Sequence, residues 1–69
     1  MDMIPVTSSN LAAVGYDDSD ASLYVQFKNG TTYQYLRVPH AIYDALMRAG
    51  SKGTFFNDEI KERFPFRQV

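Results

Sequence analysis

The sequence contains no cysteine, a single histidine and little net charge. The absence of cysteine excludes a disulfide framework and a thiolate metal site, and it favours a reducing compartment. No apolar run is long enough for a membrane helix, and the N-terminus does not have the pattern of a signal peptide. These absences predict a soluble, cytoplasmic protein that does not associate with a membrane.

The charged residues are distributed unevenly. Residues 1–27 carry four aspartates and no basic residue, whereas residues 28–69 carry all seven lysines and arginines and four acidic residues. The two parts therefore have charges of −4 and +3, which favours binding of an anion by the C-terminal part. The net charge of −1 is nevertheless far from that of a strongly basic nucleic-acid-binding protein.

Residues 22–38 carry the strongest structural signal, a β-hairpin. Two runs rich in aromatic and β-branched residues flank Asn29-Gly30, a dipeptide typical of hairpin turns. A two-residue loop would place Phe27 opposite Thr32 and would mix polar and apolar side chains on each face. A three-residue loop with Gly30 in the left-handed conformation of a bulge gives one apolar face instead, and we prefer this register. The apolar face then consists of Leu23, Val25, Phe27, Tyr33 and Tyr35.

The remaining elements follow from the spacing of apolar residues. Residues 11–16 alternate as a strand, with Leu11 and Val14 on opposite sides. A helix begins at His40 and ends at Gly50 in a left-handed cap. A second helix is capped by Ser51 and continues through Phe64 to the proline that follows.

These elements predict an α+β fold, a three-stranded antiparallel β-meander followed by two α-helices packed on one face, in the order βββαα. The chain forms a single domain, 1–69, in which residues 1–7 are expected to be loosely held. A domain of this size buries only about 60% of the surface of its unfolded chain. It is therefore a candidate for assembly into a homo-oligomer or for docking onto a larger partner protein.

Few residues suggest catalysis or metal binding. His40 lies at a helix start without other ligands at metal-binding spacing. The aspartates at 17, 18 and 20 lack the glycine and the distal glutamate of a calcium loop. We therefore predict no catalytic residue, no metal and no cofactor, and we expect that the protein is not an enzyme.

The best candidate for an anion site is Ser51-Lys52-Gly53. A capping hydroxyl, an ammonium group and a glycine lie together at a helix start, where backbone N–H groups are free. The same residues also suit a plain turn between helices, which needs small side chains. The hairpin register directs Tyr33 and Tyr35 into the core and leaves Tyr24 exposed on the outer face of the sheet.

Several short motifs occur in order along the chain: Ser8-Ser9-Asn10-Leu11, Val14-Gly15-Tyr16-Asp17, Tyr33-Gln34-Tyr35, Val38-Pro39, Ser51-Lys52-Gly53, Phe55-Phe56-Asn57 and Phe64-Pro65-Phe66. Together they resemble the KTSC domain along nearly its whole length. That module is named after the C-terminus of certain lysyl-tRNA synthetases and also occurs as small stand-alone proteins. The resemblance implies a link to RNA, since RNA binding is inferred for the family mainly from the synthetase association.

The leading hypothesis is a non-enzymatic module that binds RNA or another nucleic acid. Phosphates would be bound at Ser51, Lys52, Gly53, Arg37 and Arg63, Asn57 would orient a phosphate or base edge, and Tyr24 would stack on a base. One alternative is an oligomer that binds a small nucleotide or nucleotide signal at its subunit junctions. Another is a protein–protein docking module that uses the outer face of the sheet.

Overall fold

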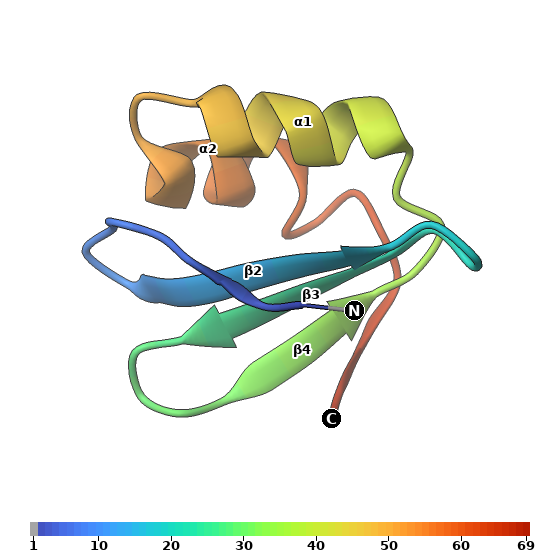
Figure 1. Ribbon diagram of the computed structural model, residues 1–69, viewed down its shortest axis with the longest axis horizontal. Coiled ribbons are helices and arrows are strands. Elements are labelled where there is room, and N and C mark those ends of the chain that lie inside the picture. Colours follow the sequence, from blue (N-terminus) through green and yellow to red (C-terminus); the bar gives the residue numbers. More distant parts are fainter. Residues whose placement is uncertain (1) are drawn as a thin grey trace.

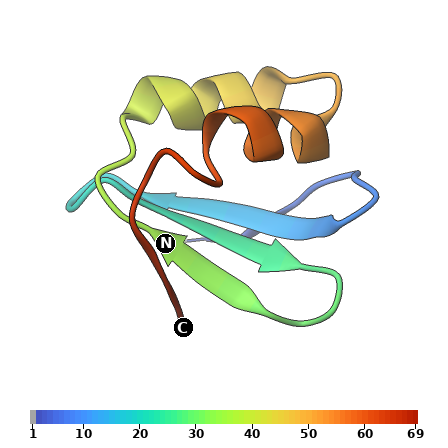
Figure 2. The same cartoon turned by 180° about the vertical axis from the view of Figure 1, so that it is seen from behind.

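The computed structural model describes residues 2–69 and shows one antiparallel sheet with two helices over one of its faces (Figures 1 and 2). The sheet has five strands in the order β1-β2-β3-β4-β5. In chain order the elements are β1 (Ile4–Pro5), β2 (Leu11–Asp17), β3 (Ser22–Phe27), β4 (Thr32–Tyr35), α1 (His40–Arg48), α2 (Lys52–Glu59) and β5 (Phe66–Gln68). The predicted α+β class and the placement of both helices on one face are confirmed.

The predicted number of strands is wrong, because the structure adds a strand at each edge of the sheet. β1 pairs with β2, so part of the segment that we expected to be loosely held is hydrogen-bonded; Met1 lies outside the described residues. β5 pairs with β4. Each added strand has two or three residues, too few for an alternating pattern, and Pro5 is compatible with a strand only at an edge.

The predicted register of the hairpin is confirmed. Leu23 pairs with Tyr35 and Val25 with Tyr33. The N–H of Phe27 donates to the carbonyl of Thr31 at 2.8 Å, and Gly30 has a φ of 94°. Glycine is the residue that adopts this conformation without a steric penalty, so Gly30 fixes which side chains of both strands face the helices.

The predicted partition of β2 is wrong at its start. Leu11 pairs with Phe27 and Ala13 with Gln26, so the register shifts by one residue between them. This irregularity turns Leu11 to the same face as Val14, and both side chains are fully buried. A simple alternation from residue 11 places them on opposite faces, because it does not allow for the extra residue.

The ends of both helices differ from the predictions. Gly50 does not take the left-handed conformation that we predicted. Instead α1 ends at Arg48, and the next residue, Ala49, is extended and its N–H donates to the carbonyl of Leu46. α2 is capped by Ser51 as predicted, but it ends at Glu59 rather than near Phe64. The N–H groups of Ile60 and Lys61 both donate to the carbonyl of Phe56, at 3.1 and 2.9 Å, which closes the last turn.

The core lies between the sheet and the helices. Its fully or almost fully buried side chains are Leu11, Val14, Leu23, Val25, Tyr35, Val38, Leu46, Phe56 and Ile60. Burial of each of the large side chains contributes about 1.5–3 kcal/mol to folding. Phe64 packs against this core from the segment after α2, which explains why its spacing resembled a continued helix.

Candidate functional site

Five aromatic side chains form a closed circle at one side of the core. The ring centroids of successive neighbours lie 5.3–5.8 Å apart, in the order Phe27, Tyr33, Phe66, Tyr35, Phe56 and back to Phe27. Four of the five contacts are edge-to-face, the arrangement that the charge distribution of aromatic rings favours. Each ring is thus oriented by two others.

The circle is assembled from four elements. β3 supplies Phe27, α2 supplies Phe56 and β5 supplies Phe66. β4 supplies Tyr33 and Tyr35, which share a face because side chains alternate along a strand. The register fixed at Gly30 therefore determines which rings can meet.

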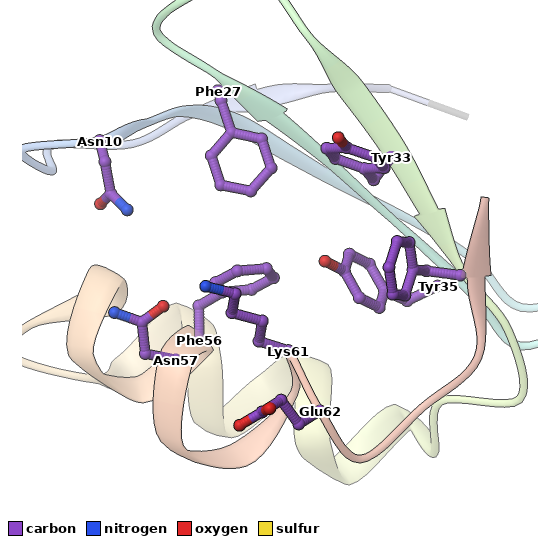
Figure 3. Close-up of a pocket in the computed structure, with 9 residues that line it drawn as sticks. Asn10, Phe27, Tyr33, Tyr35, Phe56, Asn57, Lys61 and Glu62 are labelled. Carbon is purple, nitrogen blue, oxygen red and sulfur yellow. The ribbon is translucent and has the colours of Figure 1, made fainter. Parts of the chain in front are cut away.

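The five rings line one side of an open cavity of about 400 Å³, which we call the aromatic cavity. Besides Tyr33 and Tyr35, its polar lining residues are Asn10, Asn57, Lys61 and Glu62. In Figure 3 the amides of Asn10 and Asn57 lie at one end of the cavity, and Tyr33 and Tyr35 lie at the other. Apolar walls with a few polar groups, and a volume of several hundred Å³, are typical of sites for small organic groups.

Tyr35 is the most unusual residue of the aromatic cavity. Its side chain is only 3% exposed, and its hydroxyl points into the cavity (Figure 3). Among the tyrosines, which all lie within residues 2–69, only Tyr16 donates its hydroxyl to the protein, to the carbonyl of Val38 at 2.6 Å. No side-chain nitrogen or oxygen within residues 2–69 is both buried and without a hydrogen-bond partner, so the hydroxyl of Tyr35 is open to solvent through the cavity. A bound group with a polar atom could take the place of that solvent.

Burial also changes the acidity of this hydroxyl. Desolvation, together with the nearby Tyr33, raises the pKa of Tyr35 to about 12. At neutral pH the hydroxyl is protonated, as that of an ordinary tyrosine is, and it can either donate or accept a hydrogen bond.

Three of the residues that the sequence suggested lie at the start of α2, where each has an internal contact. The hydroxyl of Ser51 accepts from the N–H of Thr54 at 3.3 Å, and the ammonium of Lys52 donates to the carbonyl of Ala49 at 3.2 Å. Gly53 lies against Asn10, since a Cβ atom at residue 53 would stand 2.6 Å from Asn10 Oδ1. These contacts build the turn between the helices and hold the segment before β2.

The other suggested residues are dispersed. Asn57 lines the aromatic cavity. Arg37 lies in the connection from β4 to α1, so the nine residues of α1, about 14 Å of helix, separate it from the start of α2 (Figure 1). Arg63 follows α2 and is exposed, whereas Tyr24 is on the outer face of the sheet and is half-buried rather than exposed. Four of the seven residues thus lie at or within α2, whereas Tyr24, Arg37 and Arg63 lie elsewhere in the fold, and their joint role in binding stays a prediction.

Most of the aromatic cavity was not identified from the sequence. The sequence directs Tyr33 and Tyr35 into the core, and Tyr35 is indeed buried, but this prediction contains no sign of the cavity beside them. One signal was available, because Tyr33 and Tyr35 are tyrosines at positions where phenylalanine would bury equally well. The contribution of Phe66 depends on β5, which the sequence did not reveal.

The described residues contain no group of three or more histidine, cysteine, aspartate or glutamate side chains that could hold a metal ion. His40 Nδ1 lies 3.0 Å from Asp44, and Nε2 lies 3.9 Å from Asp18. Neither helix within residues 2–69 is long and apolar enough to cross a membrane.

Comparisons with known proteins give a consistent result. The model of the KTSC domain matches residues 7–64. The crystal structure of a KTSC domain protein from Yersinia pestis has a TM-score of 0.93 and 42% sequence identity, over 99% of this chain and 96% of that one. A protein from Tsukamurella paurometabola is 44% identical over 90% of this chain and 92% of its own length. A lysine–tRNA ligase from Nostoc punctiforme is 37% identical over 78% of this chain, but the match covers only 10% of the ligase.

Proposed function

Because the chain belongs to the KTSC domain family, we propose that it is a nucleic-acid-binding module that takes one unstacked base of a single-stranded RNA into the aromatic cavity. The observation that carries this proposal is the closed circle of five aromatic rings, which lines a cavity into which the hydroxyl of Tyr35 points. A base is flat and apolar on its faces and polar at its edges, which matches rings with a polar group between them.

The polar residues of the cavity support the same ligand. The amide of Asn57 offers a donor and an acceptor, as the edge of a base requires. The amide of Asn10 offers its donor, since its Oδ1 accepts from the hydroxyl of Ser8 at 3.2 Å and lies against Gly53. Lys61 supplies an ammonium group for a backbone phosphate. Relatives that are lysine–tRNA ligases are consistent with an RNA ligand.

The charge of the chain determines which interaction dominates. With a net charge of −1, general attraction for phosphates is weak, so stacking must supply most of the affinity, about 1–3 kcal/mol per base. One phosphate contact through Lys61 gives a small dependence on salt, with a slope of about −0.7 in a plot of log K against log salt concentration. This differs from the several phosphate contacts that the sequence suggested.

Fluorescence anisotropy with labelled single-stranded homopolymer RNAs tests the proposal. Single strands should bind, duplex RNA should not compete because its bases are paired, and Phe66→Ala should weaken binding by at least about fivefold. Val69→Ala is the matched control, since Val69 is also an exposed apolar residue next to β5 but does not line the cavity. Equal competition by duplex RNA, or full affinity of Phe66→Ala, would reject the proposal.

A free nucleotide is the second candidate ligand. The volume of the aromatic cavity favours it, because about 400 Å³ within one chain is enough for a small molecule without a subunit junction. Competition by nucleoside monophosphates separates the two: a free nucleotide that binds more tightly than any single strand identifies the chain as a nucleotide-binding protein.

Both candidates involve binding without a reaction. The polar groups that line the cavity are two amides, two phenols, one ammonium and one carboxylate, and His40 lies outside it.

A further inference from the structure

We propose that Gln34, on the outer face of the sheet, is a positioning residue for the aromatic cavity, because it holds β5 in the register that places Phe66 beside Tyr35. The inference rests on the proposed function only for the identity of the ligand. Gln34 itself does not line the cavity.

Gln34 is the centre of a buried polar network. Its side chain is 4% exposed, and that of Ser22 is 1% exposed. The amide Nε2 of Gln34 donates to Ser22 Oγ at 2.9 Å, and the amide Oε1 accepts from Nε of Arg67 at 2.9 Å. A guanidinium group has only donors, so Arg67 also fixes which end of the amide faces β5.

The network acts on the cavity through the alternation of side chains. Gln34 pairs with Arg67 and Tyr35 pairs with Phe66. Because successive side chains point to opposite faces, Arg67 is bound on the outer face while Phe66 stands on the cavity face. There its ring lies 5.3 Å from that of Tyr35 and 5.6 Å from that of Tyr33.

β5 has few other features that fix its register. It has three residues, all exposed, at the edge of the sheet. Two backbone hydrogen bonds flank it, from Leu36 N–H to Pro65 at 2.8 Å and from Val69 N–H to Thr32 at 3.0 Å. A slip by one residue would turn Phe66 to the outer face and open the circle of rings. The contact between Arg67 and Gln34 cannot survive that slip, so it selects the closed arrangement.

The first measurement is the nuclear Overhauser contact between the rings of Phe66 and Tyr35 in the free protein. Gln34→Met keeps the length of the side chain and removes both hydrogen bonds, and we expect it to abolish this contact. Gln26→Met is the matched control, because Gln26 also pairs across the sheet on the outer face but has no side-chain hydrogen bond within residues 2–69. Gln34→Glu should retain the contact, since its carboxylate accepts from both Arg67 and the hydroxyl of Ser22.

The second measurement is affinity for single-stranded homopolymer RNA. Gln34→Met should bind at least about fivefold more weakly, which is the effect of losing one stacking ring, and Gln34→Glu should restore the affinity. If Gln34→Met does not fold, Arg67→Ala tests the same contact from an exposed residue.

The outcomes separate the two proposals. The positioning role is supported if Gln34→Met and Arg67→Ala both lose the Phe66–Tyr35 contact, even if no RNA binds. Amide hydrogen exchange should show unchanged protection of the β2–β3 pairing in both variants, so that the loss is confined to β5. Retention of that contact in both variants overturns the role, whatever the affinity of the wild-type protein for RNA.

Discussion

The side chain of Asn10 lies directly against Gly53: a methyl group added at residue 53 would stand 2.6 Å from Asn10 Oδ1 and 3.4 Å from Ser8 Oγ. The start of α2 and the segment before β2 therefore approach one another as closely as a glycine allows. Since Asn10 lines the aromatic cavity, Gly53 helps to orient one of its polar groups.

Gly53→Ala should weaken RNA binding by about fivefold, the value of one hydrogen bond, because the new methyl group displaces the amide of Asn10. In an ordinary helix the same substitution raises the free energy of unfolding by about 0.5–1 kcal/mol. We expect that gain to appear only in the double variant Asn10→Ala/Gly53→Ala, measured by urea denaturation. Gly50→Ala is the control, since open space surrounds Gly50. Normal binding by Gly53→Ala would show that the amide of Asn10 does not contact the ligand.

Gly30→Ala should lower the free energy of unfolding by about 1–2 kcal/mol. Gly30 has a φ of 94°, and a Cβ atom added there would have no neighbour within 4 Å. The loss of stability therefore comes from the strained backbone conformation alone. Urea denaturation of Gly30→Ala, with Gly50→Ala as the control, measures this difference in the free energy of unfolding. A variant as stable as the wild-type protein would mean that another turn serves the hairpin equally well.

The hairpin could be predicted from the sequence because its signals are local. The dipeptide Asn29-Gly30 and the alternation on both sides fix the register without any knowledge of the remaining chain. The end of α2 could not be predicted, because it depends on hydrogen bonds to the carbonyl of Phe56. The orientation of Leu11 toward the core could not be predicted either, because it depends on a bulge in β2. Neither the hydrogen bonds that close the last turn of α2 nor the bulge in β2 changes the spacing of apolar residues along the sequence.

The candidate site was less predictable than the fold. The sequence suggested Lys52 and Gly53 as anion-binding residues because one is basic and the other is small. In the structure both residues make contacts within the protein. The aromatic cavity depends instead on space left beside the rings, and on Phe66, which a strand of three residues supplies. A sequence shows which side chains are apolar, but it does not show where their packing leaves a gap.

Tyr35→Phe should separate binding from stability. The hydroxyl of Tyr35 makes no hydrogen bond within residues 2–69 and is open to solvent, so its removal should leave the free energy of unfolding nearly unchanged, while RNA affinity falls by about fivefold. Tyr16→Phe is the matched control with the opposite pattern. It loses the hydrogen bond to Val38, which should cost about 1 kcal/mol of stability and no affinity. Equal affinities for Tyr35→Phe and the wild-type protein would exclude a hydrogen bond to the ligand.

Alkaline pH should destabilise the protein through the same hydroxyl. Burial raises the pKa of Tyr35 from 10.0 to about 12, so between these values the unfolded chain loses its proton while the folded chain retains it. The folded state then binds more protons than the unfolded state, and stability must fall as pH rises through this window. The stabilising contribution is complete below pH 10 and is lost above pH 12.

Urea denaturation across this range should show a shallower decline of the free energy of unfolding with pH for Tyr35→Phe than for the wild-type protein. Burial and nearby aspartates also raise the pKa of Tyr16. The variant Tyr16→Phe therefore measures how much of the loss of stability with rising pH is due to Tyr16 rather than Tyr35. Identical declines for Tyr35→Phe and the wild-type protein would mean that the hydroxyl of Tyr35 is as well solvated in the folded state as in the unfolded chain.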